Sequence, residues 1–252
     1  MYRSGNPALN DLTFEKSAYK EVSWWEDSES NLMSMNGVVD KTALLLTIVT
    51  LTAIAVYLTV PISLFLTFLG AIVGFVVALI IIFSGSMNPI LICTYAACQG
   101  LFLGGITWII EKQVDAPGLG IVAAVLTLLI LGVMLSIYRA GLISWNKNMQ
   151  IAVTSSMVAI LLIYLVSFIG SFVGFEVPLI HGNGTVGIAF SVFVVGIASL
   201  CLVADFDFIE RGVERGAPKQ LEWRAAFGLL VTLIWLYLEI LKLLAKLAAS
   251  RR

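Results

Sequence analysis

Three carboxylates lie in or beside stretches that are otherwise apolar, and they are the residues best placed to do chemistry. Asp205 and Asp207 follow a long uncharged stretch, and Glu239 lies within another, well beyond Arg224. A charged side chain inside a bilayer is costly unless it faces a partner, water or the interior of a helix bundle. Intramembrane acids are therefore typical of ion or proton paths, and we assign this role to Asp205, Glu239 and, third, Asp207.

The two aspartates are expected to differ in position. Residues two apart on a helix project about 200° apart, so Asp205 and Asp207 cannot both face the interior easily. Asp207 is nearer to the charged residues Glu210 and Arg211 and is expected at the cytoplasmic rim, paired with a base. Asp205 and Glu239 are the stronger candidates for sensing pH and for binding a cation.

Each acid also has a structural alternative, in which it pairs with a base and only locks helices together. For Glu239 the base would be Lys242, three residues further along and on the same helix face. Lys242 could instead snorkel outward to the membrane surface. Both possibilities stay open at this point.

The composition indicates that lipid surrounds these acids. Of the 252 residues, 60% are hydrophobic and 12% are charged, against about 45–50% and about 25% in ordinary soluble domains. So few charges could not cover a soluble chain of this length. The formal net charge of −1 gives no reason to expect nucleic acid as a partner. The bilayer itself is the first partner that the sequence predicts.

The charged residues are clustered, and the uncharged stretches between them are long enough to cross a bilayer, at about 20 residues each. The stretch from Thr42 to Phe83 would make one helix about 60 Å long, twice the hydrocarbon core, so we divide it at Pro61. The sequence predicts seven membrane-spanning helices, at about 42–60, 62–83, 90–110, 119–138, 151–173, 186–208 and 225–247.

These spans predict an all-α integral membrane protein. The apolar runs are continuous and about twice the length of a barrel strand. We expect two parts, a polar N-terminal cytoplasmic tail at 1–41 and a seven-helix transmembrane domain at 42–252. The tail has no apolar core, so it is not expected to be a signal peptide.

The distribution of positive charge predicts the orientation, because cytoplasmic loops carry an excess of Lys and Arg. With seven spans, the side of the N-terminus receives Arg3, Lys16, Lys20, Lys41, Arg139, Lys147, Arg211, Arg215, Lys219 and Arg224. The other side receives only Lys112, Lys242, Lys246, Arg251 and Arg252. We expect a cytoplasmic N-terminus and an external C-terminus.

The chain lacks the residue types and motifs of common enzymes, which argues against an enzyme. The single histidine, His181, is expected in a loop, and the chain has no His-Glu-x-x-His zinc motif and no phosphate-binding loop. No cofactor is expected. The three cysteines, Cys93, Cys98 and Cys201, are expected to be small packing residues.

Pairs of glycines four residues apart are expected to let helices approach closely. They occur at Gly70/Gly74, Gly100/Gly104 and Gly170/Gly174. We expect this packing to be internal to the chain rather than between copies, so a monomer is favoured.

Five segments together resemble the Bax inhibitor-1 superfamily, and most closely its bacterial YccA-like branch. They are residues 6–9 (NPAL), 100–104 (GLFLG), 205–209 (DFDFI), 224–231 (RAAFGLLV) and 236–239 (LYLE). The resemblance implies a seven-helix fold whose last helix is central. It also implies a bacterial inner-membrane location and a calcium leak gated by protonation of a carboxylate pair, which maps to Asp205 and Glu239.

The chain differs from the better-known members of this superfamily at several places, and two of them concern the acid pair directly. Glu239 stands where the family has an aspartate, and residues 82–85 (IFSG), at the end of the second span, carry no base that could hold the acid pair. Ca²⁺ prefers oxygen ligands, which Asp205 and Glu239 supply. The alternative function is a non-enzymatic interaction protein that modulates a membrane protease or a stress-response complex.

Overall fold

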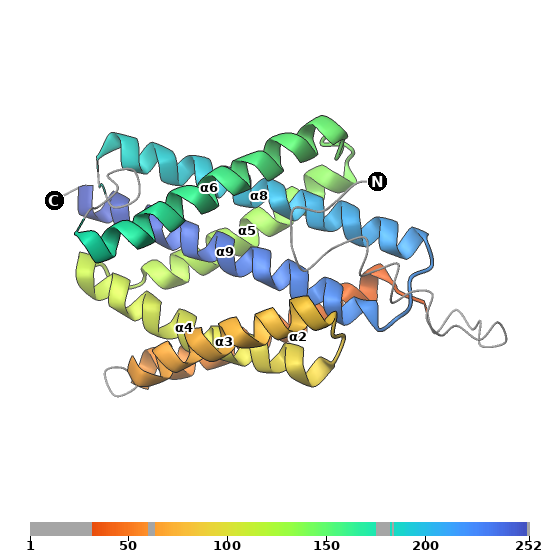
Figure 1. Cartoon of the computed structure of the whole chain (residues 1–252), viewed down its shortest axis with the longest axis horizontal. Coiled ribbons are helices and arrows are strands. Elements are labelled where there is room, and N and C mark those ends of the chain that lie inside the picture. Colours follow the sequence, from red (N-terminus) through yellow and green to blue (C-terminus); the bar gives the residue numbers. More distant parts are fainter. Residues whose placement is uncertain (1–31, 60–63, 175–181, 183, 251–252) are drawn as a thin grey trace. The chain divides into compact units, whose positions relative to one another are not determined.

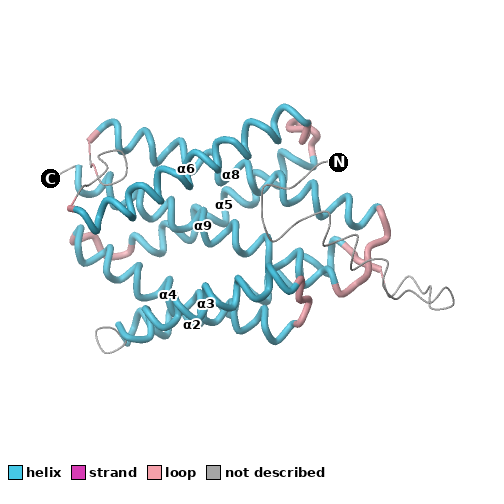
Figure 2. Tube along the Cα trace, viewed as in Figure 1, coloured by secondary structure: helices cyan, strands magenta, loops and turns pink. Residues whose placement is uncertain are grey.

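The computed structural model describes residues 32–59, 64–174, 182 and 184–250, and these form helices joined by short loops (Figures 1 and 2). The helices are α2 (Met35–Thr59), α3 (Leu64–Ser84), α4 (Pro89–Val114), α5 (Leu119–Arg139), α6 (Lys147–Val173), α8 (Thr185–Glu214) and α9 (Leu221–Ser250). All seven are long and apolar enough to cross a membrane. The protein is therefore an all-α, seven-span membrane protein, as predicted.

The helices extend further into polar sequence than their apolar runs indicate. The first helix begins at Met35, within the segment assigned to the tail, while residues 1–31 lie outside the described part of the chain. The loop between the last two helices is only residues 215–220. Charged side chains can occupy the end turns of a helix, where they reach water while the backbone stays hydrogen-bonded.

Two breaks between helices agree with local sequence signals. Separate helices end at Thr59 and begin at Leu64, on either side of Pro61, which itself lies outside the described residues. Helix α6 begins at Lys147 because the side chain of Asn146 accepts a hydrogen bond from the backbone N–H of Met149, 2.9 Å away. The expected loop at His181 is outside the described residues.

The chain forms two compact units. The first consists of residues 1–109 and 205–231, and the second of residues 110–204 and 232–252. Helices α4, α8 and α9 contribute residues to both units.

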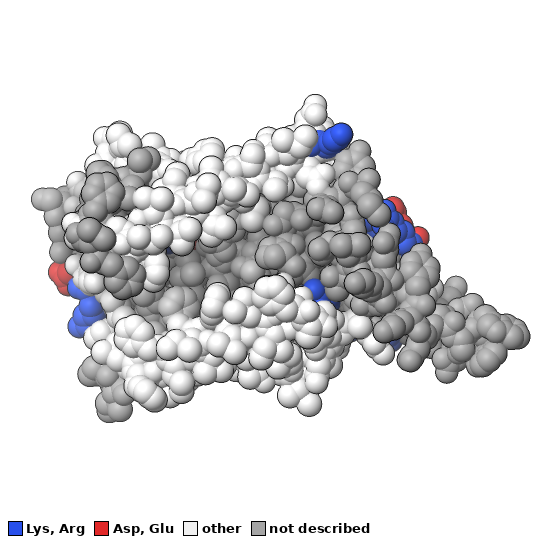
Figure 3. Space-filling model, in the orientation of Figure 1, with Lys and Arg blue, Asp and Glu red and all other residues white. Residues whose placement is uncertain are grey.

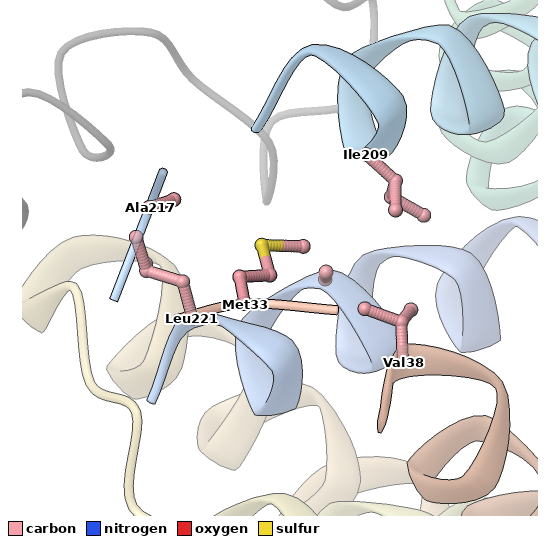
Figure 4. Packing of buried hydrophobic residues seen from close by; sticks show 6 residues of the cluster. Met33, Val38, Ile209, Ala217 and Leu221 are labelled. Atoms are coloured by element: carbon pink, nitrogen blue, oxygen red, sulfur yellow. The ribbon is translucent and has the colours of Figure 1, made fainter. Parts of the chain in front are cut away.

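In the first unit, the beginning of α9 is surrounded by other helices. Its buried residues Leu221 and Ala225 pack with Met33, just before α2, with Val38 in its first turn and with Ile209 of α8. Figure 4 shows the side chain of Met33 among these neighbours. Further along α9, the ring of Phe227 meets that of Tyr95 on α4 edge to face, with centroids 4.9 Å apart. The expectation of a central last helix is met within this unit.

Small residues bring α4 close to its neighbours, as the glycine spacing predicts. A Cβ atom on Gly100 would collide with the side chain of Thr52, and one on Gly104 would collide with the backbone of Ala53. Gly70 of α3 lies similarly against the backbone carbonyl of Cys98. Gly174 has a different role, because it ends α6 with a φ of 75° and no atom lies within 4 Å of its Cβ position.

Many large apolar side chains are exposed, as lipid contact requires. Examples are Leu51 of α2, Phe68 of α3, Leu129 of α5 and Leu161 of α6. In the view of Figure 3 the described surface is largely white, and charged side chains show only as small separate groups. Exposed apolar area on this scale is typical of a surface covered by lipid.

The close approach of α4 to α2 predicts that Gly104→Ala destabilises the protein. The added methyl group meets the backbone of Ala53, which cannot rotate away, so we expect a loss of about 1–3 kcal/mol. Thermal unfolding of detergent-solubilised protein measures this loss. The matched control is Gly132→Ala on α5, where nothing lies within 4 Å. Equal melting temperatures for the two variants would contradict the packing described.

Candidate ion-path residues

Glu239 lies in the second unit, and three donors bind its carboxylate. Its Oε1 accepts hydrogen bonds from Lys242 Nζ at 2.7 Å and from Trp235 Nε1 at 3.1 Å. Its Oε2 accepts one from the hydroxyl of Tyr164, on α6, at 2.8 Å. The side chain is 3% exposed. Both carboxylate oxygens therefore have donors, and one of the donors is a cation, so the hydrogen bond from Lys242 is charge-assisted.

Lys242 is the base that pairs with Glu239, which was one of the two possibilities left open by the sequence. Its ammonium is also 3.4 Å from the hydroxyl of Tyr164 and 4.6 Å from the centre of that ring, so it interacts with both the oxygen and the aromatic face. Tyr164 thus touches both members of the pair. The sequence offered no signal for Tyr164, which is 75 residues from Glu239.

Lys246 is buried, although the sequence suggested a membrane-surface residue. Its ammonium donates to the backbone carbonyl of Gly187 at 3.0 Å and to the hydroxyl of Ser191 at 2.9 Å, both near the start of α8. With Glu239 and Lys242 it forms one stripe on α9, because positions i, i+3 and i+7 share a helix face. The spacing of these three residues in the sequence already places them on one helix face.

Asp205 lies in the first unit and is wholly buried, with 0% of its surface exposed. All buried side-chain nitrogen and oxygen atoms in the described residues have hydrogen-bond partners, including the carboxylate of Asp205. Asp205 and Glu239 belong to different units. The burial of Asp205 agrees with its assignment as the inward-facing aspartate.

Asp207 forms an ion pair with Arg211, four residues further along α8. This is the partner expected for an acid near the rim. The pair lies within one helix and is partly exposed, so it stabilises the end of α8 and does not join separate elements.

Glu222 is a buried acid that the sequence analysis did not single out. Its carboxylate accepts hydrogen bonds from the backbone N–H of Ser34 at 2.9 Å and from the Ser34 hydroxyl at 3.1 Å. It also pairs with Lys41, whose ammonium lies 5.5 Å from the ring centre of Trp223. Gly37 lies directly against the carboxylate. Glu222 therefore binds the first two turns of α2 to the start of α9.

Arg224 was assigned to a cytoplasmic loop, and that position is wrong. It lies inside α9 and is only 1% exposed, and its guanidinium donates to the backbone carbonyl of Ile81 at 3.2 Å. The long side chain reaches the C-terminal part of α3 from the first turn of α9. Composition alone does not show which face of a helix a residue occupies.

No group of three His, Cys, Asp or Glu residues that could hold a metal ion occurs in the described part of the chain. Tight calcium sites use six to eight oxygen ligands.

The fold and these charged groups define a seven-span helical membrane protein with ionisable residues buried along its last helix. The model of the Bax inhibitor 1 like family matches residues 6–249. The chain therefore belongs to this family. A comparison with curated proteins returned no match.

The pairing of Glu222 with Lys41 predicts that either single substitution, Glu222→Gln or Lys41→Met, destabilises the protein. Removing one partner of a buried pair costs about 3–5 kcal/mol, and Lys41 is partly exposed, so we expect the lower part of that range. A double-mutant cycle on thermal unfolding measures the coupling. The control is the Asp207–Arg211 pair, for which a pair within one helix predicts about 0.3–0.5 kcal/mol. Equal coupling in the two cycles would contradict the role given to Glu222.

Proposed function

We propose that the protein is a passive cation leak, with Ca²⁺ as the expected ion, tuned by protonation of Asp205 and Glu239. The observation that carries the proposal is the burial of these two acids within helices that can cross a membrane. Membership of the Bax inhibitor 1 like family supports the same class of membrane protein. Carboxylate oxygens are suitable ligands for a hard cation such as Ca²⁺.

In this mechanism the two carboxylates titrate as a pair. The mechanism requires the two acids to be close enough to share a proton, because two adjacent acids in a low dielectric cannot both ionise easily. Loss of that proton creates an anionic site for a cation, or a repulsion that moves α8 relative to α9. Conduction should therefore rise as the pH rises. Two carboxylates are too few ligands to bind Ca²⁺ tightly, which suits a protein that passes the ion better than one that stores it.

The setting of this activity is also part of the proposal. We place the chain in a bacterial inner membrane, in the YccA-like branch, with a cytoplasmic N-terminus and an external C-terminus. The excess of Lys and Arg on the side of the N-terminus supports this orientation. A monomer suffices, because the glycines of α4 pack against helices of the same chain.

The first test is Ca²⁺ flux into liposomes that contain the purified protein, measured across a range of pH. We expect flux through the parent to rise with pH, and Asp205→Asn and Glu239→Gln to abolish that dependence. Glu214→Gln, an exposed change on α8, is the control and should behave like the parent. Equal flux and equal pH dependence in all four proteins would exclude the proposal.

The second candidate function is a membrane interaction protein that modulates a partner, such as a membrane protease or a stress-response complex. It is favoured by the anchoring of the segment assigned to the tail near its end, where the backbone N–H of Met33 donates to the carbonyl of Ala217 at 2.7 Å. A partner bound to the tail would thus act next to the loop between α8 and α9.

Deleting residues 1–31 tests this second function, because the deletion keeps Met33 and Ser34 in place. If the tail binds a partner, the deletion removes the co-purifying protein and leaves Ca²⁺ flux unchanged. Mass spectrometry of the purified complexes is the measurement. The same set of co-purifying proteins with and without the tail would remove the support for this function.

A further inference from the structure

The stripe of charge on the second half of α9 contains one acid and two bases, which is unexpected for a site that attracts cations. We propose that the ammonium of Lys242 is a tethered cation that occupies the cation position at Glu239, and that a passing cation must displace it. The inference rests on the proposed cation leak, and it names the group that keeps the leak closed at this point.

The contacts of Lys242 are those that a free cation would make. Its ammonium is 2.7 Å from a carboxylate oxygen of Glu239 and 3.4 Å from the phenol oxygen of Tyr164, and it lies against the ring of Tyr164. Oxygen atoms and an aromatic face are general ligands for cations. While Lys242 is in place, these atoms are not available to another cation.

The exposure of the three side chains indicates which of them can move. The side chain of Lys242 is 39% exposed, whereas that of Glu239 is 3% exposed. Lys246 is buried and holds two oxygens of α8. Lys242 has a flexible stem of four carbons and can swing away from Glu239, whereas Lys246 is fixed by its hydrogen bonds.

Displacement of Lys242 leaves a site that is ready for a cation. Glu239 keeps its hydrogen bonds from Trp235 and Tyr164, so its position is retained. The carboxylate then lacks its counter-charge, which favours the entry of another cation. Lys246 remains on the same face and repels the entering ion, which keeps binding weak and release fast.

The first experiment uses the full chain with Lys242→Met, which keeps most of the side-chain volume and removes the charge. Tb³⁺ replaces Ca²⁺ as a probe of binding, because Trp235 lies beside Glu239 and can sensitise its luminescence. Lys242→Arg, which retains the charge, is the matched control. Trp235→Phe shows how much of the signal comes from this site, since the chain has six tryptophans.

We expect Lys242→Met to bind Tb³⁺ more tightly and to pass Ca²⁺ faster, each by roughly 1.4-fold to fivefold, the range expected for removal of a partly exposed ion pair. Lys242→Arg should stay near the parent. If Lys242→Met binds Tb³⁺ more tightly but neither protein passes Ca²⁺, Lys242 does occupy a cation position at Glu239, but the leak fails and with it the role of Lys242 in closing it. If the parent passes Ca²⁺ and Lys242→Met neither binds nor passes ions better, the leak holds and the inference is overturned.

A second measurement uses the parent protein and does not depend on the folding of any variant. An amine-reactive reagent labels lysines according to their exposure, and mass spectrometry reads each site. If a cation displaces the ammonium, adding Ca²⁺ increases labelling of Lys242, leaves the buried Lys246 unreactive and does not change the exposed Lys219. Unchanged or reduced labelling of Lys242 in the presence of Ca²⁺ would overturn the inference.

Discussion

The structure depends on one constraint: a charged side chain inside a membrane needs a partner of opposite charge or a hydrogen-bonding group next to it. Helix α9 meets this constraint at both ends. Near its start, Glu222 receives Lys41 and the N–H of Ser34, and in its second half Glu239 receives Lys242 and Tyr164. These contacts tie α9 to α2 in the first unit and to α6 in the second. The charges that a bilayer would exclude are thus the groups that fix the position of the last helix.

The same constraint divides the charged residues of α9 by the way in which their charges are compensated. Glu222 is fixed by a partner on another helix, and Lys246 is fixed by neutral oxygens of α8. The pair of Glu239 and Lys242 is different, because one member is buried and the other is half-exposed on the same helix. An ion pair of unequal exposure can open on one side without disturbing the packing, which is a property that a gate needs. Asp205 on α8 is different, because its side chain is wholly buried and has no exposed side.

Local sequence signals predicted much of this arrangement. They did not predict the contacts between segments that are far apart in the sequence. Hydropathy gave seven spans, Pro61 marked the break between α2 and α3, and the spacing of three residues gave Lys242 as the partner of Glu239. The pairing of Glu222 with Lys41 spans 181 residues, and nothing in either neighbourhood specifies the other. The burial of Arg224 was missed for a related reason, since a charged residue beside an apolar run can face either the loop or the core.

The proposed cation leak requires that Asp205 and Glu239 titrate as one pair although they come from different helices. Infrared spectroscopy of the protonated carboxyl band, followed against pH in the parent and in the single variants Asp205→Asn and Glu239→Gln, tests this claim most directly. Coupled acids lose their protons in steps that belong to the pair. The account predicts that removing either acid changes the titration of the other. Two titrations that each stay the same when the other acid is removed would contradict it.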